Sequence, residues 1–169
     1  MLTEEIRIDK YLPEEEKYRL LLAQIKSLLV KKDNLISSLS NFTAAIKDSF
    51  EKVSWVGFYL FDGTNLYLGP FQGKVACTNI EIGKGVCGNS AKKRETIIVP
   101  DVDKFPGHIA CDSNSKSEIV IPLVKAEKLL GVLDLDSHEY NSFGNTDKEY
   151  LEEICKFLCD EIFPSTNEK

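Results

Sequence analysis

Three of the five cysteines in this chain lie where no regular apolar pattern accounts for them. Cys111 stands in the stretch FPGHIACDSNSKSE (105–118), Cys77 follows the segment GPFQGK, and Cys87 lies in GKGVCG. The glycines of GKGVCG let backbone or a ligand approach closely, and loops on a rigid scaffold are where reactive groups concentrate. These three thiols are therefore candidates for one shared functional site, with separate structural roles as the alternative.

A structural zinc site is a competing interpretation of these thiols, with His108 as a fourth ligand. Cys77 and Cys87 are ten positions apart and Cys87 and Cys111 are twenty-four apart, whereas structural zinc sites usually use close pairs such as C-x(2–4)-C. His108 is more simply a loop histidine that hydrogen-bonds to backbone. The spacing disfavours a metal site, and we expect none.

The two remaining cysteines, Cys155 and Cys159, stand four apart at or beside the apolar stripe of a predicted C-terminal helix. Free cysteine is among the most buried residue types and packs as a small hydrophobe. We therefore expect both side chains to fill space in the core and to take no part in chemistry.

Two carboxylates alternate with leucines in LLGVLDLDS (129–137). Side chains two apart on a strand share a face, so Asp134 and Asp136 point to one side while Leu133 and Leu135 point to the core. Two like charges side by side raise each other's pKa unless a cation or water separates them. A solvated outer face, common in antiparallel sheets, is one interpretation of this pair.

A cleft with an apolar wall and an acidic floor is the other interpretation. Leu130 and Val132 are apolar and, by strict alternation, share the face of the aspartates. Glu118 begins the neighbouring predicted strand and is placed to join them. Trp55 and Tyr59, four apart in WVGFYLF, share a strand face and are available as an aromatic wall, although ordinary core packing is the better explanation of any strand aromatic taken alone.

The composition is that of an ordinary globular protein, with 43% hydrophobic and 28% charged residues among 169. This length suits one domain with its own core. A net charge of −6 without a basic run disfavours binding to nucleic acid or to anionic membranes. The acidic N-terminus has no apolar segment typical of a signal peptide, so we expect a cytoplasmic protein whose thiols are kept reduced.

Hydrophobic periodicity predicts two helices, then mostly hairpin-linked strands with one inserted helix, then a closing helix. The helices are expected over 13–31, 34–49, 85–95 and from 146 onward; the strands over 55–61, 66–71, 76–83, 96–101 and, as a pair turning near Ala126 and Glu127, over 118–137. TDKE (146–149) has the spacing of a capping box at the start of the last helix. The pattern predicts an α+β fold, an antiparallel sheet covered by helices.

Several long segments now resemble one family. WVGFYL, LGPFQGK, ACTNIEIGKGVCG, KFPGHIACDSNSKSEIVIPL and GVLDLDS are similar to the free methionine-R-sulfoxide reductases, which are single GAF domains. The resemblance runs from about residue 18 to about residue 160. It implies one GAF domain over 1–169 with a core of about 18–163, a six-stranded antiparallel sheet with helices packed on it, and usually a homodimer.

The resemblance also implies roles for individual residues. Its catalytic cysteines correspond to Cys111 as the nucleophile, Cys77 as the main resolving partner, and Cys87. Its substrate-binding residues correspond to Glu118, Asp134, Asp136, Trp55 and Tyr59. The implied substrate is free methionine-R-sulfoxide, with thioredoxin as the external reductant and no bound cofactor or metal.

These roles make one chemical hypothesis. The Cys111 thiolate attacks the sulfoxide sulfur while a protonated carboxyl, Glu118 or Asp136, donates to its oxygen. The resulting sulfenic acid condenses with Cys77, and thioredoxin reopens the disulfide. Because fold does not fix function, a non-catalytic GAF sensor of small ligands is the main alternative, and a redox or metal switch is a third.

Overall fold

A computed structural model describes residues 7–29, 34–109 and 112–164. Its elements are, in chain order, α1 (Glu14–Leu28), α2 (Leu35–Ser49), β1 (Trp55–Phe61), β2 (Asn65–Gln72), β3 (Asn79–Glu81), α3 (Gly85–Lys93), β4 (Ile97–Val99), a 3₁₀ turn (Val102–Lys104), β5 (Ser117–Lys125), β6 (Lys128–Ser137), α4 (Asn145–Phe157) and a π-helical turn (Leu158–Ile162). This order confirms the predicted α+β class. No helix within these ranges is long and apolar enough to cross a bilayer.

The strands of the described chain form one six-stranded sheet in the order β3-β2-β1-β6-β5-β4, with every neighbouring pair antiparallel. The central strand β6 sets the register. Asp136 lies opposite Trp55 on β1 and opposite Glu118 on β5, and Asp134 lies opposite Gly57. Pairing of the sheet therefore brings the predicted acids and one predicted aromatic residue together from three strands.

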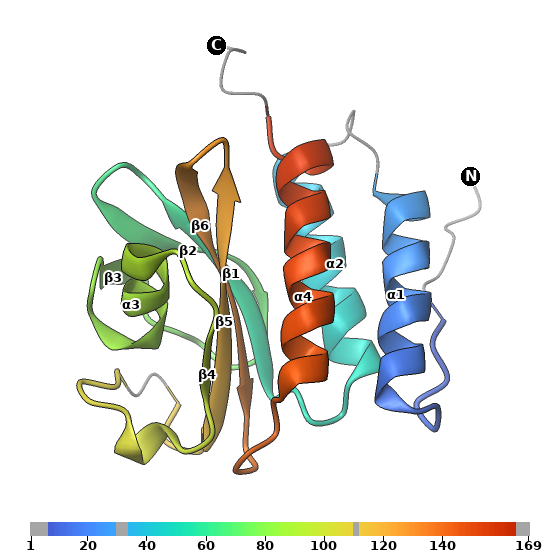
Figure 1. Cartoon of the computed structure of the whole chain (residues 1–169), viewed down its shortest axis with the longest axis horizontal. Helices are drawn as coiled ribbons and strands as arrows, with labels where there is room; N and C mark the ends of the chain where they lie inside the picture. Colours follow the sequence, from blue (N-terminus) through green and yellow to red (C-terminus); the bar gives the residue numbers. More distant parts are fainter. Residues whose placement is uncertain (1–6, 30–33, 110–111, 165–169) are drawn as a thin grey trace.

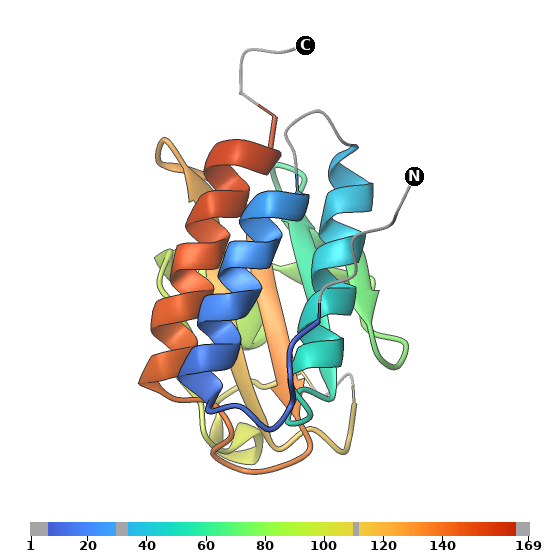
Figure 2. The same ribbon diagram turned by 90° about the vertical axis from the view of Figure 1, so that its right-hand side faces the viewer.

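Helices cover the two faces of the sheet unequally. Figure 1 shows α2 and α4 against one face, with α1 farther out, and α3 on the opposite face beside β3. In Figure 2 the three long helices stand side by side, with α1 between α4 and α2. The closing helix α4 packs on β5, while α2 packs on β1 and β2.

Each face of the sheet has its own apolar cluster because side chains alternate along the strands. Leu133 and Leu135 belong to the larger cluster, which faces α1, α2 and α4. Val132, Trp55 and Tyr59 belong to the smaller cluster, which faces α3. The predicted division of the LDLDS strand into a core face and a second face is confirmed.

The prediction that Leu130 shares the face of Val132 and the aspartates is wrong, because Leu130 packs against the larger cluster and not with Val132. The β5–β6 register moves from Leu123 opposite Gly131 to Val124 opposite Leu129, which leaves Leu130 without a position in the ladder. A residue inserted in this way is a β-bulge and reverses the alternation beyond it.

Gly131 is the residue that allows this bulge to pack against β1. Its φ is +155°, and a Cβ there would stand 2.2 Å from the carbonyl oxygen of Tyr59. No side chain fits at that separation. The hairpin closes as predicted at Ala126 and Glu127, which both take the left-handed conformation, with φ of 47° and 63°.

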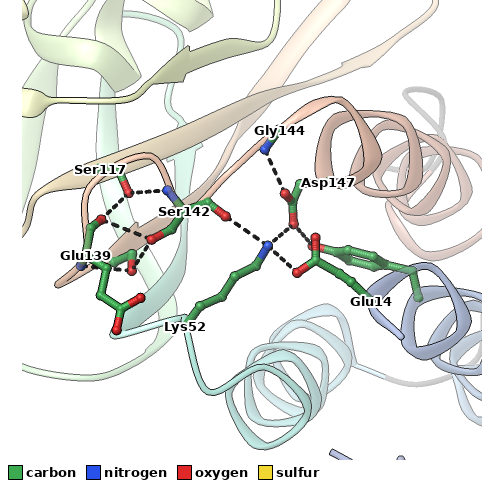
Figure 3. A network of polar contacts seen from close by, with 9 residues as sticks. Glu14, Lys52, Ser117, Glu139, Ser142, Gly144 and Asp147 are labelled. Atoms are coloured by element: carbon green, nitrogen blue, oxygen red, sulfur yellow. Dashed lines mark hydrogen bonds and ion pairs between the residues drawn. The ribbon is translucent and has the colours of Figure 1, made fainter. Parts of the chain in front are cut away.

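The predicted capping box of α4 is wrong in its position. The helix begins at Asn145, and the residue whose carboxylate turns back is Asp147, which accepts from the Gly144 N–H at 2.8 Å. Asp147 is 1% exposed and also accepts from the Tyr18 hydroxyl at 2.7 Å and from the Lys52 ammonium at 2.6 Å. These contacts connect α1, α4 and the segment before β1 (Figure 3).

Candidate functional site

The smaller face of the sheet carries a cleft at the ends of β1, β5 and β6. Residues of α3 and of the loop that follows β4 also line it. Its lining includes the predicted site residues Trp55, Tyr59, Cys87, Glu118, Asp134 and Asp136, but not Cys77. Sequence reasoning therefore found residues that the fold brings together.

Two acids form the floor of this cleft. Glu118 and Asp134 are only 5% and 6% exposed, and Asp136 is partly buried beside them. The start of β5 is fixed by Ser117, whose hydroxyl donates to the backbone carbonyl of Glu139 at 2.6 Å (Figure 3). This contact joins the strand that carries Glu118 to the segment that follows Asp136.

Burial changes the acid–base behaviour of these carboxyls. The pKa of Glu118 is raised well above its usual value, mainly by burial and then by the charge of Asp136. Burial likewise raises the pKa of Asp134, with the charge of Glu118 adding to it. The pKa of Asp136 is raised by burial and by Asp134. The floor therefore favours a proton or a cation.

The aromatic wall is a stack of three rings. Trp55 lies 6.1 Å from Tyr59 and 5.5 Å from Phe71, centroid to centroid, with small interplanar angles. Gly57 makes room for this stack, since a Cβ there would stand 2.3 Å from the Trp55 ring. Phe71 was not predicted to join this stack, because the sequence of its strand, β2, does not indicate which face of the sheet its side chain points to.

The polar ends of the two predicted aromatics hold the segment that carries Cys77. Trp55 Nε1 donates to the carbonyl of Lys74 at 3.0 Å, and the Tyr59 hydroxyl donates to the carbonyl of Cys77 at 3.1 Å. The strand predicted over 76–83 is wrong in extent, because β3 covers only Asn79–Glu81. Cys77 therefore lies in a loop, partly buried, and its backbone is held by side chains from β1.

Cys87 lies in α3, with its side chain turned toward the floor of the cleft. It is 4% exposed, and its Sγ donates to Asp134 Oδ2 at 3.2 Å. Gly88, the next residue, lets α3 pack closely against β3, because a Cβ at this position would stand 2.3 Å from the carbonyl oxygen of Glu81. Burial, then the charge of Asp134, raises the pKa of the Cys87 thiol. This cysteine is a hydrogen-bond donor rather than a ready nucleophile.

His108 was predicted to be a loop histidine that hydrogen-bonds to backbone. The structure confirms the backbone hydrogen bond and also places the imidazole ring in the cleft. The backbone N–H of His108 donates to the carbonyl of Phe105 at 3.1 Å, and its ring lines the cleft with Nε2 3.6 Å from Glu118 Oε2. Burial lowers the pKa of the imidazole. The feature of the sequence that could have indicated a place for His108 in the site is its position three residues before Cys111.

Cys111, the predicted nucleophile, lies outside the described residues. The residues that flank this gap, Ile109 and Asp112, both line the cleft. The Asp112 carboxylate contacts Lys74 Nζ at 3.4 Å and His138 Nε2 at 3.1 Å. Asp112 therefore connects its own loop to the segment that leads to Cys77 and to the end of β6.

Cys155 and Cys159 lie in the larger apolar cluster, each 2% exposed and each a free cysteine. Their thiols are on the opposite side of the sheet from the cleft. The prediction that they fill the core is confirmed.

Comparison with known proteins gives consistent matches. Residues 34–162 match the GAF domain family. GAF domain-containing protein A of Dictyostelium discoideum is 52% identical over 93% of this chain and 99% of its own length. The free methionine-R-sulfoxide reductase of Saccharomyces cerevisiae is 44% identical over 87% of this chain and 86% of its own.

A solved structure shows the same likeness in three dimensions. The X-ray structure of free methionine-R-sulfoxide reductase from Neisseria meningitidis, in complex with its substrate, aligns with a TM-score of 0.89 and 42% identity. The alignment covers 94% of this chain and 95% of that one.

Proposed function

Because this chain belongs to the GAF-domain family of free methionine-R-sulfoxide reductases, we propose that it reduces free L-methionine-(R)-S-oxide to L-methionine. The observation that carries the proposal is the composition of the cleft. Buried acids, the aromatic residues Trp55 and Tyr59, and the thiol of Cys87 line one space, and Cys77 packs against the same apolar cluster. A sensor that only binds a small ligand needs no thiols there.

The cleft offers a partner for each part of the free amino acid. The substrate ammonium pairs with an acid of the floor, and its methyl group lies against the ring of Trp55. The substrate carboxylate is bound by backbone N–H groups. The first turn of α3 is a suitable donor, because Lys84, Gly85 and Val86 line the cleft and the helix N-terminus carries positive partial charge.

The chemistry uses a thiol and a retained proton. The Cys111 thiolate attacks the sulfoxide sulfur, and Glu118 or Asp136, whose raised pKa keeps a proton near neutral pH, donates to the oxygen. Methionine leaves two electrons richer, and the oxygen stays on Cys111 as a sulfenic acid. Attack by the Cys77 thiol releases that oxygen as water and forms a Cys77–Cys111 disulfide, which the dithiol of thioredoxin reduces.

The decisive test replaces the nucleophile. We expect Cys111→Ser to abolish loss of free methionine-R-sulfoxide in a thioredoxin-coupled assay, because a hydroxyl does not form the sulfenic acid. Cys159→Ala is the matched control, since its thiol lies on the other face of the sheet, and it should retain turnover. Full turnover in Cys111→Ser would overturn the proposal.

Two further measurements separate the reductase from its alternatives. Racemic substrate should be consumed to half, because only one sulfoxide epimer reacts, whereas a sensor consumes none. Mass spectrometry after one turnover without reductant should find a Cys77–Cys111 peptide. A product linked only through Cys87 would contradict the resolving role of Cys77.

We also infer that the chain works as a cytoplasmic homodimer that needs no bound cofactor. The support is the family itself, whose reaction draws electrons from an external dithiol. Light scattering coupled to gel filtration should give twice the 19.0 kDa chain mass. A mass of one chain at micromolar concentration would contradict the dimer.

A further inference from the structure

The floor of the cleft gathers the donor atoms of a metal site from three separate elements. Cys87 Sγ, a carboxylate oxygen of Asp134 and a carboxylate oxygen of Glu118 all lie within 4.8 Å of one another. They come from α3, β6 and β5. Donors on one tetrahedral Zn²⁺, with bonds of about 2.0–2.3 Å, stand roughly 3.3–3.8 Å apart, so small side-chain rotations bring all three onto one ion.

A second observation points to a missing partner at this place. Asp134 Oδ1 is buried and has no hydrogen-bond partner among the described residues, although Asp134 is only 6% exposed and lines the cleft. Its other oxygen accepts the weak S–H donor of Cys87. A buried carboxylate oxygen without a partner is costly, so Asp134 keeps an unused ligand atom at the floor of the cleft.

His108 lies outside this group of three, and a rotation of its side chain is needed to bring it onto the same ion as a fourth donor. Its Nε2 is 3.6 Å from Glu118 Oε2, and its ring lines the same cleft. Burial favours the neutral imidazole, which is the form that binds metals. Cysteine, histidine and two carboxylates together are a donor set that suits Zn²⁺.

A proton held by Glu118 is the alternative way to relieve the repulsion between Glu118 and Asp134, and such a proton is one that the proposed reduction can use. A divalent cation relieves the same repulsion more completely, because its charge opposes both carboxylates and the Cys87 thiolate at once. Binding displaces the thiol proton and the proton held by Glu118, so the affinity rises with pH.

We propose that the reduced protein binds one Zn²⁺ ion through Cys87, Asp134, Glu118 and His108. The ion occupies the acidic floor, so it excludes the substrate sulfoxide and ammonium from the groups that bind them. Zinc is then a reversible inhibitor of the reductase. This inhibitory consequence rests on the proposed function, whereas metal binding itself does not.

The test uses Co²⁺ and Zn²⁺ alone with metal-free, reduced protein and no substrate. One equivalent of Co²⁺ should give a sulfur-to-cobalt charge-transfer band. Cys87→Ser should remove the band and weaken Zn²⁺ binding by about tenfold or more, measured by chelator competition. Asp134→Asn should weaken binding while keeping the band.

The double variant Cys77→Ser/Cys111→Ser is the matched control, and it should keep both the band and the affinity. A band that persists in Cys87→Ser, that disappears in the double variant, or that is absent from the wild type would overturn the metal site. Circular dichroism confirms folding of each variant, and Cys87→Ala serves if Cys87→Ser does not fold.

Inhibition is measured separately from binding. If the proposed function holds, Zn²⁺ should raise the apparent KM for methionine-R-sulfoxide, and Cys87→Ser should reduce this sensitivity. Metal binding by a protein without reductase activity would refute the proposed function and leave the metal site standing. Turnover that is insensitive to saturating Zn²⁺ would refute the inhibition.

Discussion

Two buried aspartates on opposite sides of the sheet differ in how well they are partnered. Asp147, on the side of the long helices, accepts hydrogen bonds from Tyr18, Lys52 and the Gly144 backbone (Figure 3). Asp134, in the cleft, accepts one bond from Cys87 and keeps one oxygen unpartnered among the described residues. Both are almost fully buried.

This difference distinguishes a buried charge that stabilises the fold from one that is kept for function. A buried charge that stabilises a protein is paired and fully hydrogen-bonded, as Asp147 is. A buried charge left incomplete lowers stability and is retained where a ligand completes it. Asp134, the carboxylate with an unpartnered oxygen among the described residues, lies on the face with the aromatic stack and Cys87.

The largest expected change in stability comes from removing the ion-pair partner of Asp147. Lys52→Met leaves Asp147 buried without its cation, and loss of one partner of a buried pair costs about 3–5 kcal/mol. Lys52 is 17% exposed, so the lower end is expected. Urea unfolding should show a lower midpoint, with turnover per folded molecule unchanged. An unaltered midpoint would show that Asp147 is not structurally important.

A smaller effect on stability is expected when a buried cysteine on each face of the sheet is replaced by serine. Cys155→Ser puts a hydroxyl into the apolar cluster, at an expected loss of about 1–2 kcal/mol in the free energy of unfolding. Cys87→Ser should change stability by less than about 0.5 kcal/mol, because the new hydroxyl can donate to Asp134 as the thiol does. Equal losses in the two variants would remove the distinction between the two cysteine environments.

The smallest effect has the opposite sign. Glu118→Gln should raise the free energy of unfolding at pH 8 by about 0.5–2 kcal/mol, the usual gain from relieving strain kept for function. Turnover should fall, because a proposed proton donor and substrate contact is lost. The measurement is urea unfolding in EDTA at several pH values, with Glu95→Gln at an exposed position as the control.

The pH dependence follows from the direction of the shift. The pKa of Glu118 is higher in the folded protein, by burial first, than the value near 4 expected when unfolded. The folded state therefore holds a proton that the unfolded state has released, and stability falls as pH rises above about 4 and through the folded pKa. The gain in Glu118→Gln should grow over that window. A gain that is constant with pH would contradict ionisation of Glu118 as its source.

The order of elements and much of the site were predictable from local pattern. Alternation in LDLDS placed Asp134 and Asp136 on one face, because side chains two apart on a strand point the same way. Helical spacing placed Cys155 and Cys159 in the core. The role of Cys111 stays a prediction, because it lies outside the described residues.

Other features depended on contacts between distant segments. Leu130 lies in a bulge that the pairing of β5 with β6 creates. The ring of His108 meets Glu118, and the thiol of Cys87 meets Asp134, only because α3 and the loop after β4 fold over the sheet. No local periodicity encodes these meetings.

The sequence by itself therefore determined which residue types this protein places on each face of its strands, since strand alternation is a local property of the backbone. Only the tertiary structure decided which of those groups are satisfied. Whether a carboxylate has a partner depends on side chains far away in the chain, such as Tyr18 for Asp147, and on the absence of one beside Asp134 Oδ1 among the described residues.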